Sequence, residues 1–227
     1  MVNEGASHSG EHSKKLLQSL NFELRTLLNG FVGPIQLLKY KLDDPELVEI
    51  FRLFDSSTSR LERLAVRTSI FQNLDNSKFV FKSDLINLVD LAKFCILDLQ
   101  PITELENVKL SINENSPGNT SIIKGDYNVL SQAFSILFEM AINLSAQNDN
   151  IVIEFNSFEE ELMCQITSPT ATFSSDLNIQ LSNGDSYDSL PWDILLAKAI
   201  LSEHNAYLSL SENISKSNSF KIVFKKE

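Results

Sequence analysis

The stretch PELVEIFRLFDSSTSRLERLAVRTSIFQN occupies residues 45–73 and carries an unbroken heptad pattern. Its repeat positions, three and four residues apart in alternation, are Leu47, Ile50, Phe54, Ser57, Leu61, Leu64, Thr68 and Phe71. This spacing is typical of a helix that packs along a coiled-coil seam. Pro45 suits the first turn of such a helix, where a backbone N–H has no partner inside the helix. The pattern therefore predicts one long helix over 45–73.

A second helical pattern precedes it, from about residue 11 to residue 42. Leu17, Leu24, Phe31 and Leu38 recur every seven residues. The turn DDP at 43–45 joins the two helices into a hairpin, which we assign to a domain over 11–73. Its apolar faces are too extensive for one partner helix to cover, so we expect two chains to form a four-helix bundle as a homodimer. The alternative is that the hairpin packs against the C-terminal half of its own chain.

The remaining chain alternates strands with helices, which predicts an α/β sandwich over 78–227. We expect strands at 78–81, 108–112, 120–124, 151–155, 161–166, 206–211 and 219–225. We expect helices over 84–99, capped by Ser83, and over 127–147 and 192–204. Residues 168–189 are rich in Ser, Thr, Asn and Asp and predict a loop, and a turn is expected at Pro117 and Gly118. Residues 1–10 are small and polar, and we expect them to be disordered. The fold class is α+β.

Composition limits the classes of partner. The formal net charge of −11 argues against nucleic acid and against anionic membranes. No apolar run reaches the length of a membrane span and no signal-peptide layout begins the chain, so a cytoplasmic protein is expected.

Cys95 and Cys164 lie in apolar stretches, where reduced, buried thiols are expected. The three histidines have no metal-ligand spacing, which leaves a zinc site without support.

The segment NFELRTLLNGFVG (21–33) resembles the phospho-acceptor box of sensor histidine kinases, which reads S-H-E-L-R-T-P-L-N. The matching positions are Glu23, Leu24, Arg25, Thr26, Leu28 and Asn29. Phe22 stands where the family has its phosphorylated histidine. A phenyl ring has no nucleophilic nitrogen, so phosphoryl transfer through this position is chemically excluded. Leu27 replaces the family's proline, and Pro34 is expected to bend the helix slightly later.

The segment GDYNVLSQAFSILFEMAINLSA (125–146) resembles the helix that carries the asparagine box of the family's GHKL-type ATPase domain. Met140 occupies the position of the asparagine that holds magnesium in the family. His204 coincides with a structural histidine of the family, at a helix end whose dipole favours a cation. His12 allows two interpretations, a displaced phosphorylation site or part of a frayed polar segment. The resemblance implies the ATPase fold over the C-terminal half.

The resemblance also implies that nucleotide-binding residues have been lost. Ser168 stands at the family's adenine-reading aspartate, and Pro191 and Asp193 replace glycines that approach the phosphates. Losing the carboxylate contact to adenine costs about 1.5–3 kcal/mol. A proline removes a backbone donor, and an aspartate places a like charge near the triphosphate. We therefore expect a degenerate ATPase domain without a bound cofactor.

These features predict a non-catalytic signalling protein that binds a two-component partner, either a response-regulator receiver domain or a sensor kinase. The expected partner-binding residues are Phe22, Arg25, Thr26, Asn29, Gly30 and Gly33. An exposed aromatic is a common interface anchor, and small residues leave room for an incoming helix.

Two enzymatic or adaptor alternatives remain open. In the family, an acidic residue after the histidine and a polar residue further along can assist dephosphorylation of the regulator. Glu23 and Thr26 occupy those positions, so a response-regulator phosphatase is the first alternative. A phosphotransferase-like adaptor fits the architecture but lacks the histidine.

Overall fold

The computed structural model describes residues 22, 24–26, 28–39, 45–74, 80–113, 121–171, 191–212 and 218–226. The chain divides into two compact units, Met1–Val80 and Phe81–Glu227. The predictions for residues 1–10, His12, Glu23, the turn at Pro117 and Gly118, and most of the 168–189 loop lie outside the described residues. None of the described helices is long and apolar enough to cross a membrane.

The first unit is a helical hairpin. The described residues between 22 and 39 are helical, and the second helix is α2 (Pro45–Leu74). Two side-chain contacts join the helices at separate levels. Lys39 Nζ lies 2.5 Å from Asp55 Oδ2, and Arg25 donates to the hydroxyl of Ser69 at 3.4 Å. Two antiparallel helices joined by a short connection are therefore present where the heptad patterns predict them.

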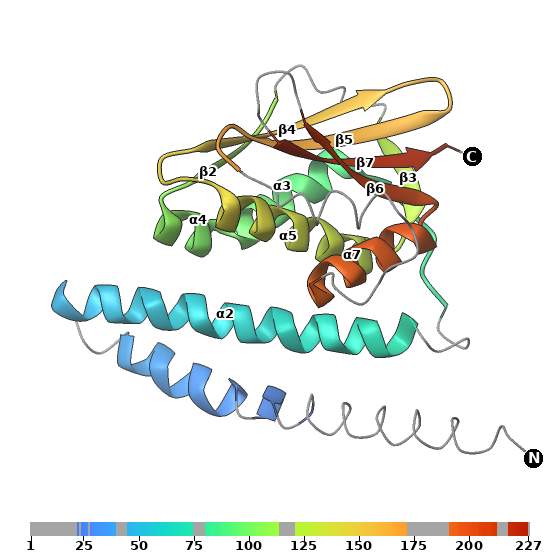
Figure 1. Ribbon diagram of the computed structural model, residues 1–227. Coiled ribbons are helices and arrows are strands. Elements are labelled where there is room, and N and C mark those ends of the chain that lie inside the picture. The colour runs from blue at the N-terminus through green and yellow to red at the C-terminus, as the bar shows by residue number, and fades with distance from the viewer. Residues whose placement is uncertain are drawn as a thin grey trace, which may run out of the picture. The chain divides into compact units, whose positions relative to one another are not determined.

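The second unit contains a five-stranded sheet and a separate two-stranded sheet (Figure 1). The larger sheet has the order β2-β4-β5-β7-β6, in which β2 and β4 are parallel and every other pair is antiparallel. Its strands are β2 (Lys109–Ile112), β4 (Asn150–Ser157), β5 (Glu161–Ser168), β6 (Ala206–Glu212) and β7 (Asn218–Lys225). The smaller sheet pairs β1 (Asp84–Asn87) with β3 (Ile122–Gly125) in antiparallel register.

Helices cover one face of the five-stranded sheet (Figure 1). They are α3 (Leu88–Asp98), α4 (Gln100–Glu106), α5 (Tyr127–Leu144) and α7 (Trp192–Glu203). Alternate residues of β4 and β5 point to this face and are buried, because a strand has a side-chain period of two. Phe134 of α5 is fully buried between an edge-to-face contact with Phe138 and a stacked contact with Phe224 of β7. The result is the α/β sandwich predicted from the sequence.

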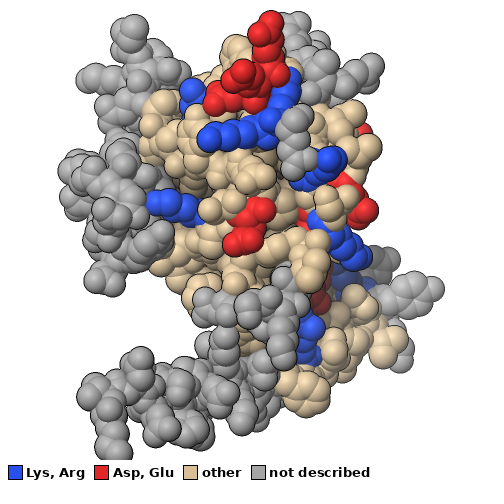
Figure 2. Space-filling view, turned by 90° about the vertical axis from the view of Figure 1, so that its right-hand side faces the viewer, with Lys and Arg blue, Asp and Glu red and all other residues tan. Residues whose placement is uncertain are grey.

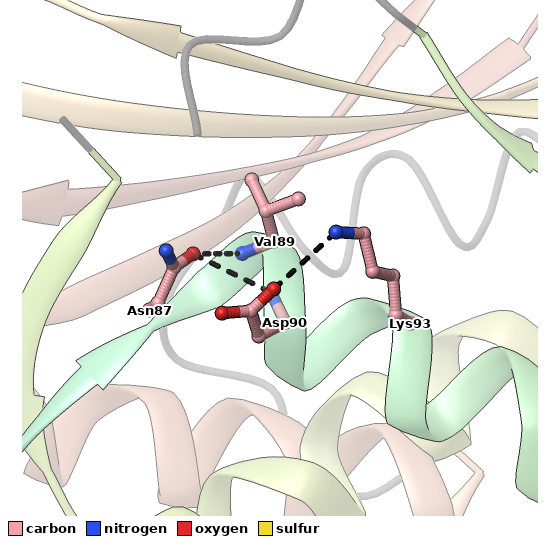
Figure 3. A network of polar contacts seen from close by, with 4 residues as sticks. All are labelled: Asn87, Val89, Asp90 and Lys93. Atoms are coloured by element: carbon pink, nitrogen blue, oxygen red, sulfur yellow. Dashed lines mark hydrogen bonds and ion pairs between the residues drawn. The ribbon is translucent and has the colours of Figure 1, made fainter. Parts of the chain in front are cut away.

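Side-chain caps begin two of these helices. Figure 3 shows Asn87 Oδ1 accepting hydrogen bonds from the backbone N–H groups of Val89 and Asp90 at the start of α3. Lys93 forms an ion pair with Asp90 one turn further on. Asp126 caps α5 in the same way through the N–H groups of Asn128 and Val129. Such caps satisfy backbone donors that have no partner inside the helix.

The structure corrects the prediction for the first strand of this unit and for the cap of α3. The strand expected at 78–81 is absent at residues 80 and 81, and β1 lies instead at Asp84–Asn87. The helix expected to follow Ser83 starts at Leu88 and is capped by Asn87. The reason is non-local: Ile86 is buried where β1 pairs with β3, although the same letters fit a helical pattern. The structure also contains the short helix α4, which the sequence analysis does not predict.

The two cysteines are buried and free, as predicted. Burial raises the pKa of the Cys95 thiol to about 12, and the pKa of Cys164 is raised by burial as well. Neither thiol is therefore an appreciable thiolate at neutral pH. Both residues act as small apolar core side chains.

Candidate functional site

The predicted partner-binding residues share one exposed side of the first helix. Phe22 is 73% exposed, and Arg25, Thr26, Asn29, Gly30 and Gly33 are exposed as well. At 3.6 residues per turn these six positions fall within a sector of roughly 140°. Leu28 lies outside this sector, roughly 60° beyond Arg25, and is buried. The helix therefore presents Phe22 and the small residues together on its outer surface.

The glycines on this side have open space around them. Apart from the neighbouring residues and the backbone of the same helix, no atom of the described residues lies within 4 Å of a Cβ atom built at Gly30 or at Gly33. Packing inside the hairpin therefore does not require glycine at either position. Thr26 Oγ1 donates a hydrogen bond of 2.8 Å to the carbonyl of Phe22, one turn earlier. This bond uses the donor of the hydroxyl and leaves its lone pairs for an incoming group.

Helix α2 has two separate faces with different surroundings. Asp55, Ser59 and Glu62 line a cavity between α2 and the first helix. Leu61 is 41% exposed and Leu64 is 38% exposed, and both lie roughly 100–160° around the helix from Glu62. The seam residues predicted from the heptad pattern are thus only partly covered within one chain.

Polar residues of the seam are satisfied within their own helix. The Ser57 hydroxyl donates to the carbonyl of Leu53 at 2.8 Å, and the Thr68 hydroxyl donates to the carbonyl of Leu64 at 2.5 Å. A hydroxyl with its donor already used can be buried at low cost. Another helix can therefore cover the seam without leaving the hydroxyl donors of Ser57 and Thr68 buried and unpaired.

The position predicted to correspond to the family's adenine-reading aspartate, Ser168, lies in a closed hydrogen-bond network. Ser168 ends β5 and is 1% exposed. Its hydroxyl lies 2.6 Å from the Ser145 hydroxyl and 3.3 Å from Asp149 Oδ2, and it accepts the N–H of Ala171 at 3.1 Å. Thr170 also donates to Asp149 and accepts the N–H of Ala146. The Ser145 hydroxyl donates to the carbonyl of Ala141.

Every hydroxyl in this network therefore has both a donor and an acceptor partner. Reading a base at this position would require one of these bonds to break. The sequence predicts the loss at Ser168, but no motif indicates that Ser145, Asp149 and Thr170 meet there. The three come from the end of α5, the connection to β4 and the residues after β5.

The other positions that the sequence predicts to be degenerate lie on α5 and around the start of α7. Met140 lies on α5 and is half-buried. Pro191 is exposed and precedes α7, where its carbonyl accepts the N–H groups of Ile194 and Leu195. Asp193 follows in the first turn of α7. Within the described part of the chain no side chain caps the start of α7, and at Pro191 the backbone has no N–H to offer a phosphate.

His204 occupies a structural position at the other end of α7. Its Nε2 accepts the backbone N–H of Asp126 at 3.0 Å, and its Nδ1 lies 2.7 Å from the carbonyl of Ile200. This pairing requires a neutral ring with the proton on Nδ1. Burial lowers the pKa of His204, so the expectation that the helix dipole would hold a cation here is wrong. Desolvation outweighs the dipole at this helix end.

The architecture matches solved histidine kinases. The histidine kinase AdeS of Acinetobacter baumannii superposes with a TM-score of 0.60 at 12% sequence identity, over 90% of this chain and 95% of that chain. The helical hairpin followed by the α/β sandwich is thus the core fold of sensor histidine kinases, and the predicted fold class is confirmed.

Curated relatives point to the same class. The chain is 23% identical to the heme sensor protein HssS of Staphylococcus saprophyticus over 92% of this chain and 46% of HssS. It is 28% identical to the autoinducer 2 sensor kinase/phosphatase LuxQ of Vibrio cholerae over 71% of this chain and 19% of LuxQ. It therefore spans less than half of either relative. No protein-family model matches the chain. These neighbours confirm the resemblance to the histidine kinase core.

Proposed function

We propose that this chain is a non-catalytic, cytoplasmic, histidine kinase-like signalling protein that dimerises through its hairpin and regulates a two-component partner by binding it. The observation that carries the proposal is Phe22, which stands at the phospho-acceptor position and is exposed on an open helix face. The chemistry of that position is lost while its accessibility is retained. An exposed aromatic beside two uncovered glycines suits an incoming helix of a receiver domain or of a sensor kinase bundle.

The experiment that tests this proposal compares two phenylalanine variants. Tagged wild-type protein, Phe22→Asp and Phe158→Asp are used to capture partners from the native cytosol, and the partners are identified by mass spectrometry. Phe158 is also exposed but lies in the other unit, so it controls for the loss of a surface phenyl ring. We expect the wild-type protein to capture a receiver-domain protein or a sensor kinase. The Phe22→Asp variant is expected to bind that partner at least about 30-fold more weakly than the wild type does, as for an interface hot spot.

Retention of that partner by Phe22→Asp would contradict docking at this face, and so would an equal loss in Phe158→Asp. Thr26→Ala separates binding from catalysis. LuxQ is named as both a kinase and a phosphatase, which gives the phosphatase alternative a concrete basis. If Thr26→Ala abolishes dephosphorylation of the captured regulator while binding persists, the chain is a phosphatase and not only a binding module.

The same proposal predicts that the ATPase-type unit does not bind nucleotide. The lost aspartate, the Met140 substitution and the proline at the start of α7 together weaken binding by roughly 10³-fold or more. We expect calorimetric titration with magnesium ADP to give no saturable heat at millimolar concentrations. A Met140→Asn, Ser168→Asp double variant is also expected not to bind magnesium ADP, because the new carboxylate at position 168 would lie beside the carboxylate of Asp149. Saturable binding by the wild type would contradict the assignment.

A further inference from the structure

His204 is held at both ring nitrogens, at the point where the end of α7 meets the start of α5. Its Nε2 accepts the backbone N–H of Asp126 at 3.0 Å, and its Nδ1 pairs with the carbonyl of Ile200 at 2.7 Å. The residue is only 8% exposed. These bonds require a ring that accepts at Nε2, whereas a protonated ring donates at both nitrogens. Protonation would therefore set the Nε2 proton against the N–H of Asp126 and break this contact.

The side chain of Asp126 holds the segment with which the second unit begins. Its Oδ2 accepts the backbone N–H of Lys82 at 3.1 Å, and its Oδ1 accepts the two N–H groups at the start of α5 described above. Phe81, the first residue of this unit, packs edge-to-face against the His204 ring. The backbone N–H of Asp126 thus binds His204, while its carboxylate binds Lys82. An imidazolium would repel the N–H group and attract the carboxylate.

The charged groups near His204 have both signs. Asp126, at the start of α5, and Glu203, on α7 itself, favour an imidazolium. Lysines on the other neighbouring segments would disfavour one, namely Lys82 next to Phe81, Lys124 of β3, and Lys225 and Lys226 at the end of β7. Both red and blue groups also lie on the face that Figure 2 views. Burial is the largest influence on the ring, and it lowers the pKa of His204, so that the ring is neutral at pH 7.

We propose that His204 and Asp126 form a proton-operated latch on the segment that begins the second unit. When the ring takes up a proton from water, its Nε2–H leaves the backbone N–H of Asp126 and bonds to the carboxylate of the same residue. Oδ2 is the oxygen that becomes engaged, because Oδ1 already accepts two N–H groups of α5. The bond from Lys82 to Oδ2 is then lost and the segment at Phe81 is released. The cavity that His204 borders gives the proton a route to the ring.

Acid is the condition that opens this latch. Because burial lowers the pKa of His204, a released ring binds a proton more tightly than the latched ring does. The latch is therefore fully closed above the ordinary histidine pKa of about 6.5, and it opens as the pH falls below that value. One proton is taken up per opening, so the opening constant is expected to rise about five- to tenfold between pH 7.5 and pH 5.5. Aspartates with an ordinary pKa of about 4 stay ionised over this range.

The test uses NMR on the full chain, labelled with ¹⁵N. At pH 7.5 we expect the ring of His204 to be the neutral Nδ1–H tautomer, and we expect its titration midpoint to lie below pH 6.5. The signal is assigned by its absence from His204→Gln. Hydrogen exchange of the Lys82 amide, corrected for its intrinsic rate, is expected to accelerate at least about fivefold from pH 7.5 to pH 5.5 in the wild type. In His204→Gln this rate is expected not to depend on pH.

An Asp126→Asn variant separates the latch from a histidine that is merely buried. The amide keeps one oxygen to cap α5, but it offers the N–H of Lys82 a donor in place of an acceptor. Exchange at Lys82 is therefore expected to be fast already at pH 7.5 and to change little with pH. Glu203→Gln is the matched control, because it removes the other carboxylate that favours the imidazolium. Since Glu203 does not hold Lys82, the fivefold response is expected to remain.

Three results would overturn the proposal. The first is an Nε2–H tautomer at pH 7.5 or a His204 midpoint at or above pH 6.5, since the ring could then not be the closed latch. The second is an unchanged exchange rate at Lys82 in the wild type while His204 titrates. The third is an equal loss of protection at Lys82 and at Ile166 in β5, which would show that acid loosens the whole unit instead of one segment. The first two need no variant, so they hold even where a substitution prevents folding.

Discussion

A Leu61→Asp, Leu64→Asp double variant is expected to be monomeric at concentrations where we expect the wild-type chain to form a dimer. Both leucines belong to the α2 seam and remain partly exposed in a single chain. Covering each exposed part contributes about 1 kcal/mol, and a dimer contains four such leucines. Burying carboxylates in their place adds a further cost. The total of at least about 4 kcal/mol raises the dimer Kd by roughly 10³-fold. Sedimentation equilibrium measures this change directly.

The control for this experiment is a Val48→Asp, Val66→Asp double variant. Both valines are exposed on α2 and lie roughly 140–160° around the helix from Leu61 and Leu64, on the side that carries Asp55 and Ser59, so circular dichroism is used to check that the hairpin stays helical. This control adds the same number of negative charges to the same helix as the first variant, and we expect the dimer to persist. If wild-type protein is already monomeric, or if both variants dissociate alike, the four-helix bundle is wrong and the helices must be covered in another way.

The helical half of the chain is predictable because its signals are local. A heptad needs only the spacing of apolar residues, and α2 ends within one residue of the expected boundary. The same periodicity is enough to place Phe22 and Gly33 on one side of the first helix. Whether a partner binds that side is a property of another molecule, which this sequence does not contain.

The features that the sequence does not predict depend on residues far apart in the chain. β1 forms because Ile86 meets Ile123 of β3, and nothing in the letters DLIN distinguishes that pairing from the start of a helix. The network at Ser168 likewise depends on Asp149, which lies in the connection between α5 and β4 and accepts a hydrogen bond from Ser168 at the end of β5. A substitution at a family position only predicts that a function is lost there. The hydrogen bonds that take its place are visible only in three dimensions.

The neutral His204 explains why Gly125 must be a glycine. A Cβ atom at Gly125 would lie 2.5 Å from His204 Cδ2 and 2.9 Å from Leu130 Cδ1. The His204 ring is held by hydrogen bonds at both nitrogens and packs against Phe81 at a centroid distance of 5.5 Å. It cannot move aside without losing one of these bonds. The glycine is therefore needed for space.

Gly125→Ala is consequently expected to lower the free energy of unfolding of the second unit by about 2–4 kcal/mol, from overpacking and a strained hydrogen bond. Trp192 is the single tryptophan of the chain and lies in this unit, so urea denaturation followed by its fluorescence measures the effect. Gly30→Ala is the same chemical change in open space, and it should stabilise the first unit by about 0.5–1 kcal/mol, measured by circular dichroism. The two glycine-to-alanine changes are therefore expected to alter the free energy of unfolding in opposite directions. An unchanged midpoint for Gly125→Ala would mean that His204 moves aside freely and does not lock the end of α7 to the start of α5.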